Sequence, residues 1–168
     1  LHDALPISIA CFTATAKREV TEEILAHFKA ETGRELRVFQ GGVERGNLEF
    51  EVEGIPSHAK LERVHELLSD QLKPHAPGAA VVFRARRSLT EATAEFLGNH
   101  GWAAAHFHAG LPAPEKKRIQ DDFLHGRVQV ICATNAFGMG IDKEDVRLVV
   151  HADTPGSIEN YLQEAGRA

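Results

Sequence analysis

The sequence predicts an α/β fold in which a mainly parallel sheet is covered by helices on both faces. Segments with strand character alternate four times with segments of helical spacing, and the strand candidates are continuous apolar runs rather than half-polar alternations. Such runs are typical of parallel strands that are buried on both sides. Ligands of these sheets gather at the carboxyl ends of the strands, so function is expected in the loops that follow the strands.

The first part of the chain is predicted to hold two helices and a connecting region. Apolar residues at helical spacing predict a helix over residues 17–28, with a stop near Gly33: Val20, Ile24 and Phe28. β-Branched and aromatic residues between the glycines of residues 35–53 indicate two short extended pieces or a linker. A second apolar face predicts a helix over residues 60–72: Leu61, Val64, Leu67, Leu68 and Leu72.

The alternation of strands and helices begins with the run AAVVF at residues 79–83. SLTE at residues 88–91 matches a capping box, and it predicts a helix with an apolar side: Leu89, Ala92, Phe96 and Leu97. Further strands are expected near residues 103–107, 128–133 and 147–152. A helix with Ile119 and Phe123 on one face precedes the third strand, and Ser157 is placed to cap a final helix.

Composition limits the classes of protein that need to be considered. The chain has 168 residues, of which 43% are hydrophobic and 26% charged, so it is expected to form one globular domain or slightly more. It has no run of about 18 apolar residues, and its start lacks the features of a signal peptide, so a cytoplasmic protein without a membrane partner is expected. The net charge of −5 argues mildly against a dedicated nucleic-acid binder but allows a local basic track.

Neither cysteine lies at zinc-ligand spacing from a second cysteine or a histidine. Cys11 and Cys132 are therefore interpreted as buried thiols, and no zinc is expected within this chain. The chain begins with leucine and stops at GRA inside a predicted helix. These two features indicate a fragment of a longer protein.

Four segments, in this order, resemble the RecQ family of DNA helicases: FTATA at 12–16, FHAGL at 107–111, ATNAFGMGIDKEDVRLVVH at 133–151 and IENYLQEAGRA at 158–168. ERGNL, which begins at Glu44, also resembles the family's Arg-Pro-Asn-Leu segment, with Gly46 where proline is usual. The resemblance implies a RecA-like three-layer fold and an ATP-dependent motor that moves 3′ to 5′ on DNA in recombination and repair. Residues 1–43 would end the first RecA-like domain, and residues 44–168 would form most of the second.

The resemblance implies nucleotide contacts for four residues, with ATP and Mg²⁺ as cofactors. Gly140 and Asp142 would approach the ribose, and Gln163 and Arg167 would face the ATP cleft, where Arg167 neutralises phosphate charge as a catalytic residue. Gln163 and Arg167 are four residues apart, so on a helix they share one face. Two alternatives stay open: a glycine-rich turn capped locally by Asp142, and a solvated helix face for Arg167. The second arginine of the family motif lies beyond Ala168.

The resemblance also implies DNA contacts for Thr134, Arg87 and His108 and a coupling role for Thr13 and Thr15. The threonines alternatively serve as helix caps, and His108 alternatively packs as a structural histidine. A further set of residues forms either a phosphate-binding patch or an ordinary exposed loop: Arg84, Arg86 and Arg87.

Several elements of a complete motor are absent from the sequence. It contains no GxxxxGK[ST] loop and no acidic pair of the DEAH type before FTATA, so the Mg²⁺ ligands are expected in an upstream RecA-like domain and the chain alone is expected to be inactive. The expected partners are single-stranded and forked duplex DNA and that upstream domain. Two other functions remain possible: the second domain of a DEAD-box-like RNA helicase, and a non-catalytic α/β nucleic-acid-binding module.

Overall fold

Four parallel strands form one sheet in the order β2-β3-β1-β4. Their bounds are Ala79–Phe83 for β1, Ala104–Phe107 for β2, Val130–Ala133 for β3 and Val146–His151 for β4. The structure is a computed structural model that describes residues 18–39, 46–137 and 143–167. Because all neighbouring strands pair in parallel, their carboxyl ends meet at one edge of the sheet, as the apolar runs predict.

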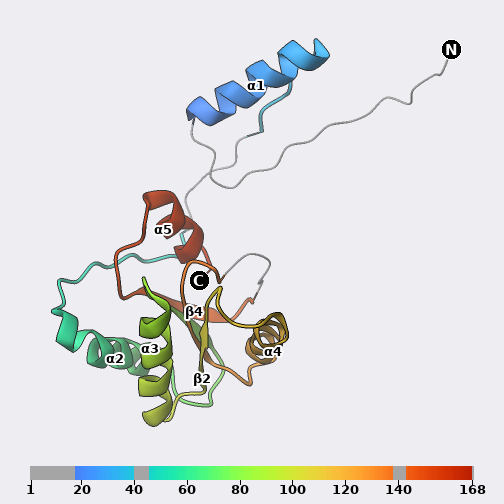
Figure 1. The fold of residues 1–168 in the computed structure, drawn as a ribbon. Coiled ribbons are helices and arrows are strands. Elements are labelled where there is room, and N and C mark those ends of the chain that lie inside the picture. Colours follow the sequence, from blue (N-terminus) through green and yellow to red (C-terminus); the bar gives the residue numbers. More distant parts are fainter. Residues whose placement is uncertain (1–17, 40–45, 138–142, 168) are drawn as a thin grey trace. The chain divides into compact units, whose positions relative to one another are not determined.

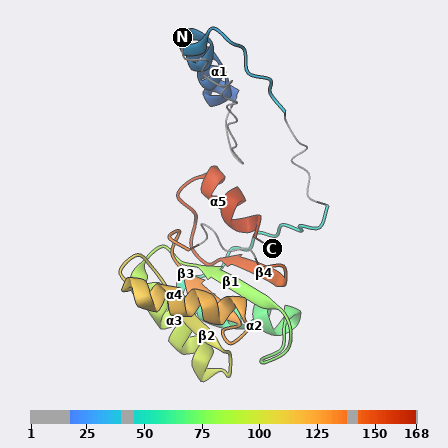
Figure 2. The same ribbon diagram turned by 90° about the vertical axis from the view of Figure 1, so that its right-hand side faces the viewer.

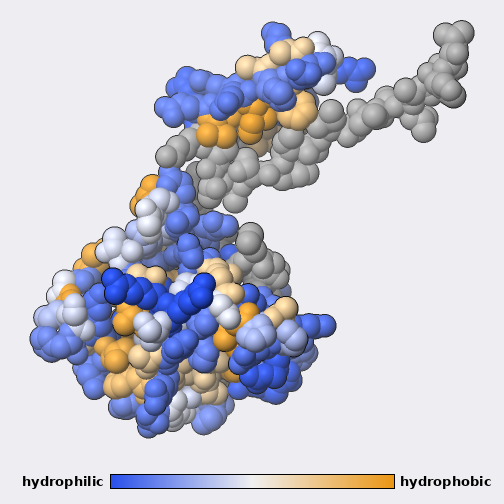
Figure 3. All heavy atoms as spheres, viewed as in Figure 1, coloured by the Kyte–Doolittle hydropathy of each residue, from blue (hydrophilic) through white to orange (hydrophobic). Residues whose placement is uncertain are grey.

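Contacts along the backbone divide the chain into two units, Leu1–Arg45 and Gly46–Ala168. The expected boundary between residues 43 and 44 lies outside the described residues. In the first unit the structure describes the helix α1, Arg18–Thr32, whose apolar residues gather along one side (Figure 3). The chain leaves α1 at Gly33, where a φ of 66° gives the left-handed backbone that glycine adopts without steric penalty.

Helices cover both faces of the sheet in the second unit (Figures 1 and 2). A short 3-10 turn, Ser57–Ala59, leads into α2, Lys60–Gln71, and the later helices are α3, Arg87–Asn99, α4, Ala113–Leu124, and α5, Ile158–Ala165. On one face, Ala80 and Val82 of β1 pack with α2 and α3. On the other face, Val81 and Phe83 pack with α4. Both sides of β1 are therefore apolar, which explains its unbroken apolar sequence.

The predicted start and apolar side of α3 are wrong in detail. Its N-cap is Arg86, without a side-chain cap, so SLTE lies inside the helix instead of before it. The buried side is Thr90, Thr93, Ala94 and Leu97, whereas Ala92 is exposed. The two threonines bury because their hydroxyls donate to the carbonyls of Arg87 and Leu89, each at 2.6 Å.

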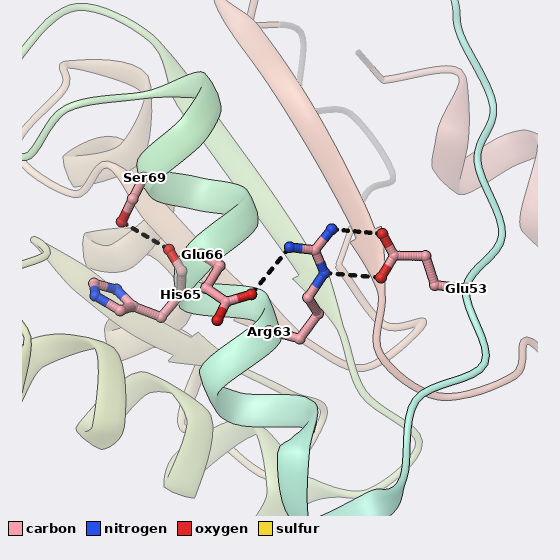
Figure 4. Close-up of polar contacts among 5 residues, drawn as sticks. All are labelled: Glu53, Arg63, His65, Glu66 and Ser69. Carbon is pink, nitrogen blue, oxygen red and sulfur yellow. Dashed lines mark hydrogen bonds and ion pairs between the residues drawn. The ribbon is translucent and has the colours of Figure 1, made fainter.

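The region expected to hold two extended pieces or a linker, residues 35–53, has no strand in its described parts, 35–39 and 46–53. Residues 46–56 are held by Arg63 of α2 (Figure 4). The Arg63 guanidinium donates to both carboxylate oxygens of Glu53, with Nε to Oε2 at 2.8 Å, and its Nη1 donates to Glu66 at 3.0 Å. The hydrogen bonds from Arg63 hold the pKa of Glu53 below its ordinary value. This bidentate contact fixes the position of the chain segment before α2.

Cys132 is fully buried in β3, as expected. Burial raises the pKa of its thiol to about 12, although the nearby Arg84 charge lowers it. Cys11 lies outside the described residues. Across residues 18–39, 46–137 and 143–167, no helix is both long and apolar enough to cross a bilayer.

A buried ion pair joins the ends of β1 and β4. Arg84 Nε lies 3.2 Å from Asp153 Oδ2, and the Ala85 N–H donates to the same oxygen at 3.0 Å. Lys60 of α2 donates to Asp153 Oδ1 at 2.9 Å. Burial of Asp153 raises the pKa of its carboxyl, but the hydrogen bonds from Lys60 and Ala85 and the Arg84 charge outweigh burial, so the pKa lies below its ordinary value. This cluster connects three elements at the carboxyl edge.

Replacement of Asp153 by asparagine is expected to destabilise the chain, because Arg84 is then buried without its counter-ion. The expected loss at pH 7 is roughly 3 kcal/mol in the free energy of unfolding, measured by urea denaturation. Because the pKa of Asp153 is lowered on folding, its contribution is complete above the ordinary carboxyl value and is lost as pH falls through the lowered value. The difference in unfolding free energy between the wild type and the variant should therefore become smaller below about pH 4.

Asp70→Asn is the matched control, since Asp70 is exposed on α2. An equal loss of stability in Asp153→Asn and Asp70→Asn contradicts the prediction. A difference in unfolding free energy between the wild type and Asp153→Asn that grows in acid contradicts it as well.

Candidate functional site

The loops that follow the four strands lie at one edge of the sheet, where ligands of parallel α/β folds bind. Because the sheet order is β2-β3-β1-β4, the loops after β2 and β3 lie toward one side and the loop after β4 toward the other. The sequence-predicted residues divide in the same way. Thr134 and His108 follow β3 and β2, whereas Gln163 and Arg167 come after β4.

The structure brings the three candidate DNA-contact residues into one neighbourhood. Arg87 starts α3, and a Cβ placed on Gly110 would lie 2.8 Å from its Nη1 and 3.2 Å from Nδ1 of His108. The missing side chain of Gly110 leaves room for this close approach. The Thr134 N–H donates to the carbonyl of Phe107, the residue before His108, at 3.2 Å. Arg87 is exposed and Thr134 half-buried, so both are accessible from solvent.

His108 is buried, with 5% of its surface exposed, and it is paired. Its Nε2 lies 3.0 Å from Glu91 Oε1 of α3, and its ring stacks on His106 with centroids 5.4 Å apart. Neither Glu91 nor His106 is predicted from the sequence as a partner of His108. The available signal was the pattern His-x-His, because alternate residues of a strand lie on one face.

The basic residues after β1 do not form one surface patch. Arg84 is buried and paired with Asp153, so its side chain belongs to the ion pair between β1 and β4. Arg86 and Arg87 are exposed. The phosphate-binding interpretation therefore applies at most to these two residues.

A buried pair fixes α5 against the end of β4. His151 Nε2 lies 2.8 Å from Glu164 Oε2, and both side chains are nearly buried. The His151 ring also stacks on Phe83 and lies 4.9 Å from the ring of Tyr161. At the start of α5, Ser157 Oγ accepts a hydrogen bond from the Asn160 N–H at 3.2 Å, which confirms the predicted cap. Figure 1 shows α5 beyond the edge of the sheet.

Gln163 lies on α5 with its side chain exposed, and Arg167 is half-buried beyond the helix. The expected helix through Arg167 is wrong, because α5 ends at Ala165 and Gly166 is its C-cap. Glycine disfavours the helix interior, and the Arg167 N–H instead makes a turn-like bond to the Glu164 carbonyl at 3.4 Å. Burial lowers the pKa of Arg167, while the Glu164 charge opposes the shift. Gln163 and Arg167 therefore do not share a helical face. They lie near each other in sequence at the carboxyl end of α5, with Arg167 just beyond the C-cap.

Four candidate residues from the sequence lie outside the described residues: Thr13, Thr15, Gly140 and Asp142. Both flanks of the segment that holds Gly140 and Asp142 are nevertheless anchored. Phe137 is buried and packs against the rings of Phe107 and Phe123. On the other flank, Lys143 Nζ lies 5.5 Å from the centre of the Phe123 ring and 2.7 Å from Asp145. Phe123 of α4 therefore contacts both ends of this segment.

A depression of about 230 Å³ lies elsewhere. Its lining includes Gly78 before β1, Gln129 before β3 and Asp145 before β4, at the amino-terminal edge of the sheet. The carboxyl edge therefore presents separated side chains on loops and a helix end, which suits a surface completed by another domain.

The family described as helicase conserved C-terminal domain matches residues 59–168. ATP-dependent DNA helicase RecQ of Haemophilus influenzae is 36% identical over 160 residues, which cover 95% of this chain and 24% of that protein. RecQ of Bacillus subtilis is 36% identical over 168 residues, which cover 100% and 27%. RecQ-like DNA helicase BLM of Xenopus laevis is 37% identical over 164 residues, which cover 96% and 12%. The chain spans about a quarter or less of these relatives.

Solved helicase structures share the fold. S. cerevisiae Dbp5 bound to RNA and ADP BeF3 superposes with a TM-score of 0.70 at 23% identity, over 93% of this chain and 40% of that chain. Mycobacterium smegmatis helicase Lhr bound to ssDNA and AMP-PNP gives 0.56 at 26% identity, over 64% of this chain and 14% of that chain. These likenesses confirm the predicted RecA-like α/β fold. The chain therefore belongs to the helicase conserved C-terminal domain family and, within it, to the RecQ helicases.

Proposed function

We propose that this chain supplies the second motor domain of an ATP-dependent DNA helicase that moves 3′ to 5′ and acts in recombination and repair. The observation that carries the proposal is the division of the polar side chains at the carboxyl edge into two groups. Arg87, His108 and Thr134 form the group beside β2 and β3, and Gln163 and Arg167 form the group beside β4. A motor domain needs one surface for the DNA strand and one for the nucleotide.

The group beside β4, here called the nucleotide group, has the chemistry to contact ATP. The exposed Gln163 amide both donates and accepts hydrogen bonds, and the Arg167 guanidinium is suited to phosphate oxygens. The pair His151–Glu164 fixes the helix that carries Gln163, so little side-chain and helix motion has to be frozen when ATP binds. ATP supplies the phosphoryl group that is hydrolysed, and Mg²⁺ is proposed to be held by an upstream RecA-like domain. Arg167 then stabilises the negative charge that develops on the departing phosphoryl group.

The group beside β2 and β3, here called the DNA group, is suited to contact the sugar-phosphate backbone of DNA rather than its bases. Arg87 offers a charged donor, and Thr134 offers a hydroxyl at a strand end. Contacts of this kind bind without sequence preference, as a translocating motor requires. Single-stranded and forked duplex DNA are the proposed partners, and Thr13 and Thr15 are proposed to couple nucleotide state to DNA binding.

Two other functions are retained as outcomes of the test. The superposition with Dbp5 bound to RNA, at 23% identity, supports the fold and does not favour RNA over DNA as the substrate. A non-catalytic α/β module would bind nucleic acid without any dependence on nucleotide.

The proposal is tested by strand separation in the polypeptide that joins this chain to a first RecA-like domain. We expect unwinding of a forked DNA duplex with a 3′ single-stranded tail in the presence of ATP and Mg²⁺, and little unwinding of the matching RNA duplex. The 168-residue chain alone serves as the control and is expected to hydrolyse no ATP when single-stranded DNA is added. Preference for RNA, or turnover by the chain alone, contradicts the proposal.

In the same two-domain polypeptide, Arg167→Ala is expected to lower kcat for DNA-stimulated ATP hydrolysis by about 10² to 10³, because a positioned charge on the phosphoryl group is lost. Affinity for DNA in the absence of nucleotide should change little, since Arg167 lies in the nucleotide group. Arg118→Ala on α4 is the matched control, because Arg118 is exposed and pairs only locally with Asp122 and Glu115. Equal kcat values for the two variants refute the role of Arg167.

Arg87→Ala is expected to weaken single-stranded DNA binding uniformly across sequences. The slope of log K against log salt should become shallower by about one, because one fewer phosphate is neutralised. The measurement is fluorescence anisotropy with a labelled oligonucleotide at several salt concentrations. Lys117→Ala, an exposed charge on α4, controls for the loss of one positive charge. An unchanged salt slope for Arg87→Ala means that Arg87 does not contact a DNA phosphate.

A further inference from the structure

We propose that Glu91, His106 and His108 form a binding site for a transition-metal ion, with Zn²⁺ as the ion it fits best. The site lies between α3 and the edge strand β2. One carboxylate oxygen and one ring nitrogen from each histidine lie within 4.8 Å of one another. The inference rests on the geometry of these three side chains and does not depend on the proposed helicase function.

The backbone explains why the three residues meet. Successive side chains of a strand point to opposite faces, so His106 and His108 share the face on which Ala104 packs toward α3. Their rings are nearly parallel, with an interplanar angle of 14°. Glu91 is in the second turn of α3, the helix that covers this face of β2. Strand alternation and helix packing therefore direct two imidazoles and one carboxylate to one point.

The separation of the ligand atoms is close to what a metal ion requires. Bonds of about 2.0–2.1 Å to nitrogen and oxygen place neighbouring ligands of a tetrahedral ion roughly 3.3 Å apart. Glu91 Oε1 and His108 Nε2 are 3.0 Å apart, which already satisfies this spacing. The other separations, which reach no more than 4.8 Å, have to shorten, and the 52% exposed side chain of Glu91 has room to move when its contact with His108 is exchanged for the ion. A small side-chain movement therefore completes the three-ligand set.

One side of the site is open to solvent. His108 is buried, His106 is half-buried and Glu91 is exposed, so an ion has both fixed ligands and a route of entry. A shallow pocket beside the site is lined by Glu91, Glu95 and His106. Glu95 is one helical turn from Glu91 and adds a second negative charge to this pocket. Three protein ligands with an open position match a site in which water or a further ligand completes the coordination.

The contact between His108 and Glu91 is one that a metal ion can replace. A carboxylate oxygen accepts hydrogen bonds, so His108 Nε2 is the donor in their contact. An ion bound by both atoms takes the place of that hydrogen bond. His108 Nδ1 is buried and has no hydrogen-bond partner among the described residues, so no other bond of the ring has to break for this exchange.

The choice of ion follows from the ligand types. Imidazole nitrogens favour Zn²⁺ and its neighbours in the first transition row, whereas Mg²⁺ prefers oxygen ligands. The site is therefore distinct from any Mg²⁺ that accompanies ATP. The proposal replaces the expectation from sequence that this chain holds no zinc, which was based on the spacing of its cysteines. Glu91 and His106 are 15 positions apart and are recognised as neighbours only from the fold.

The test uses the 168-residue chain, freed of metal with a chelator and titrated with Zn²⁺ by calorimetry at pH 7.5. We expect one tight equivalent in the wild type and no comparable heat with Mg²⁺. His106→Ala and Glu91→Gln should each weaken Zn²⁺ binding at least tenfold, since loss even of an outer-shell partner costs a metal site 10- to 100-fold. With Co²⁺, the visible absorption of the wild type should show ligand-field bands that both variants lose.

His58→Ala is the matched control, because His58 is an exposed histidine distant in sequence from the site, and it should bind Zn²⁺ like the wild type. Urea denaturation without metal checks that each variant is folded; if His106→Ala is not, Glu91→Gln decides the question, since Glu91 is exposed. Absence of a tight equivalent in the wild type overturns the proposal. Binding that His106→Ala and Glu91→Gln leave unchanged overturns it equally.

Discussion

Burial of the sheet on both faces is the constraint from which the rest of the structure follows. Alternate residues of β1 enter two separate apolar clusters, one beneath α2 and α3 and the other beneath α4. A strand in this position cannot direct a polar side chain to solvent along its length. Along β1, polar side chains are therefore found only beyond the ends of the strand, and both candidate groups of the site lie at the carboxyl edge of the sheet.

Polar pairs at that edge join the loops to the sheet. Arg84 with Asp153 and His151 with Glu164 are both largely removed from water, where each charge without a partner is costly. Such pairs add little net stability relative to apolar replacements, but they accept only one geometry. They therefore determine where α2 and α5 sit against β1 and β4. The position of Gln163 follows from this geometry, because it shares α5 with Glu164.

Patterns of single elements were predictable from sequence, whereas contacts between elements were not. The apolar runs identified β1 and β3 because burial of both faces leaves a direct trace in composition. The buried side of α3 was misassigned because threonine counts as a polar residue in a sequence pattern. In the structure the hydroxyls of Thr90 and Thr93 donate hydrogen bonds within the helix, so both residues can be buried. Asp153 and Glu164 were not singled out, since their partners Arg84 and His151 are distant along the chain or on another element. The same limit applies to Glu91 and His106.

The end of β1 lies between the two groups of the carboxyl edge and contacts elements of both. Phe83, its last residue, stacks on His151, which holds α5. Arg84 and Ala85 follow and bind Asp153 in the loop after β4. Two residues later, Arg87 begins α3 and lies against Gly110 beside His108. A displacement of α5 therefore reaches Arg87 through five consecutive residues, of which Phe83 and Arg84 are buried. This short connection physically links the group beside β4 with the group beside β2 and β3, and its two buried residues can transmit a displacement because packed interiors do not absorb it.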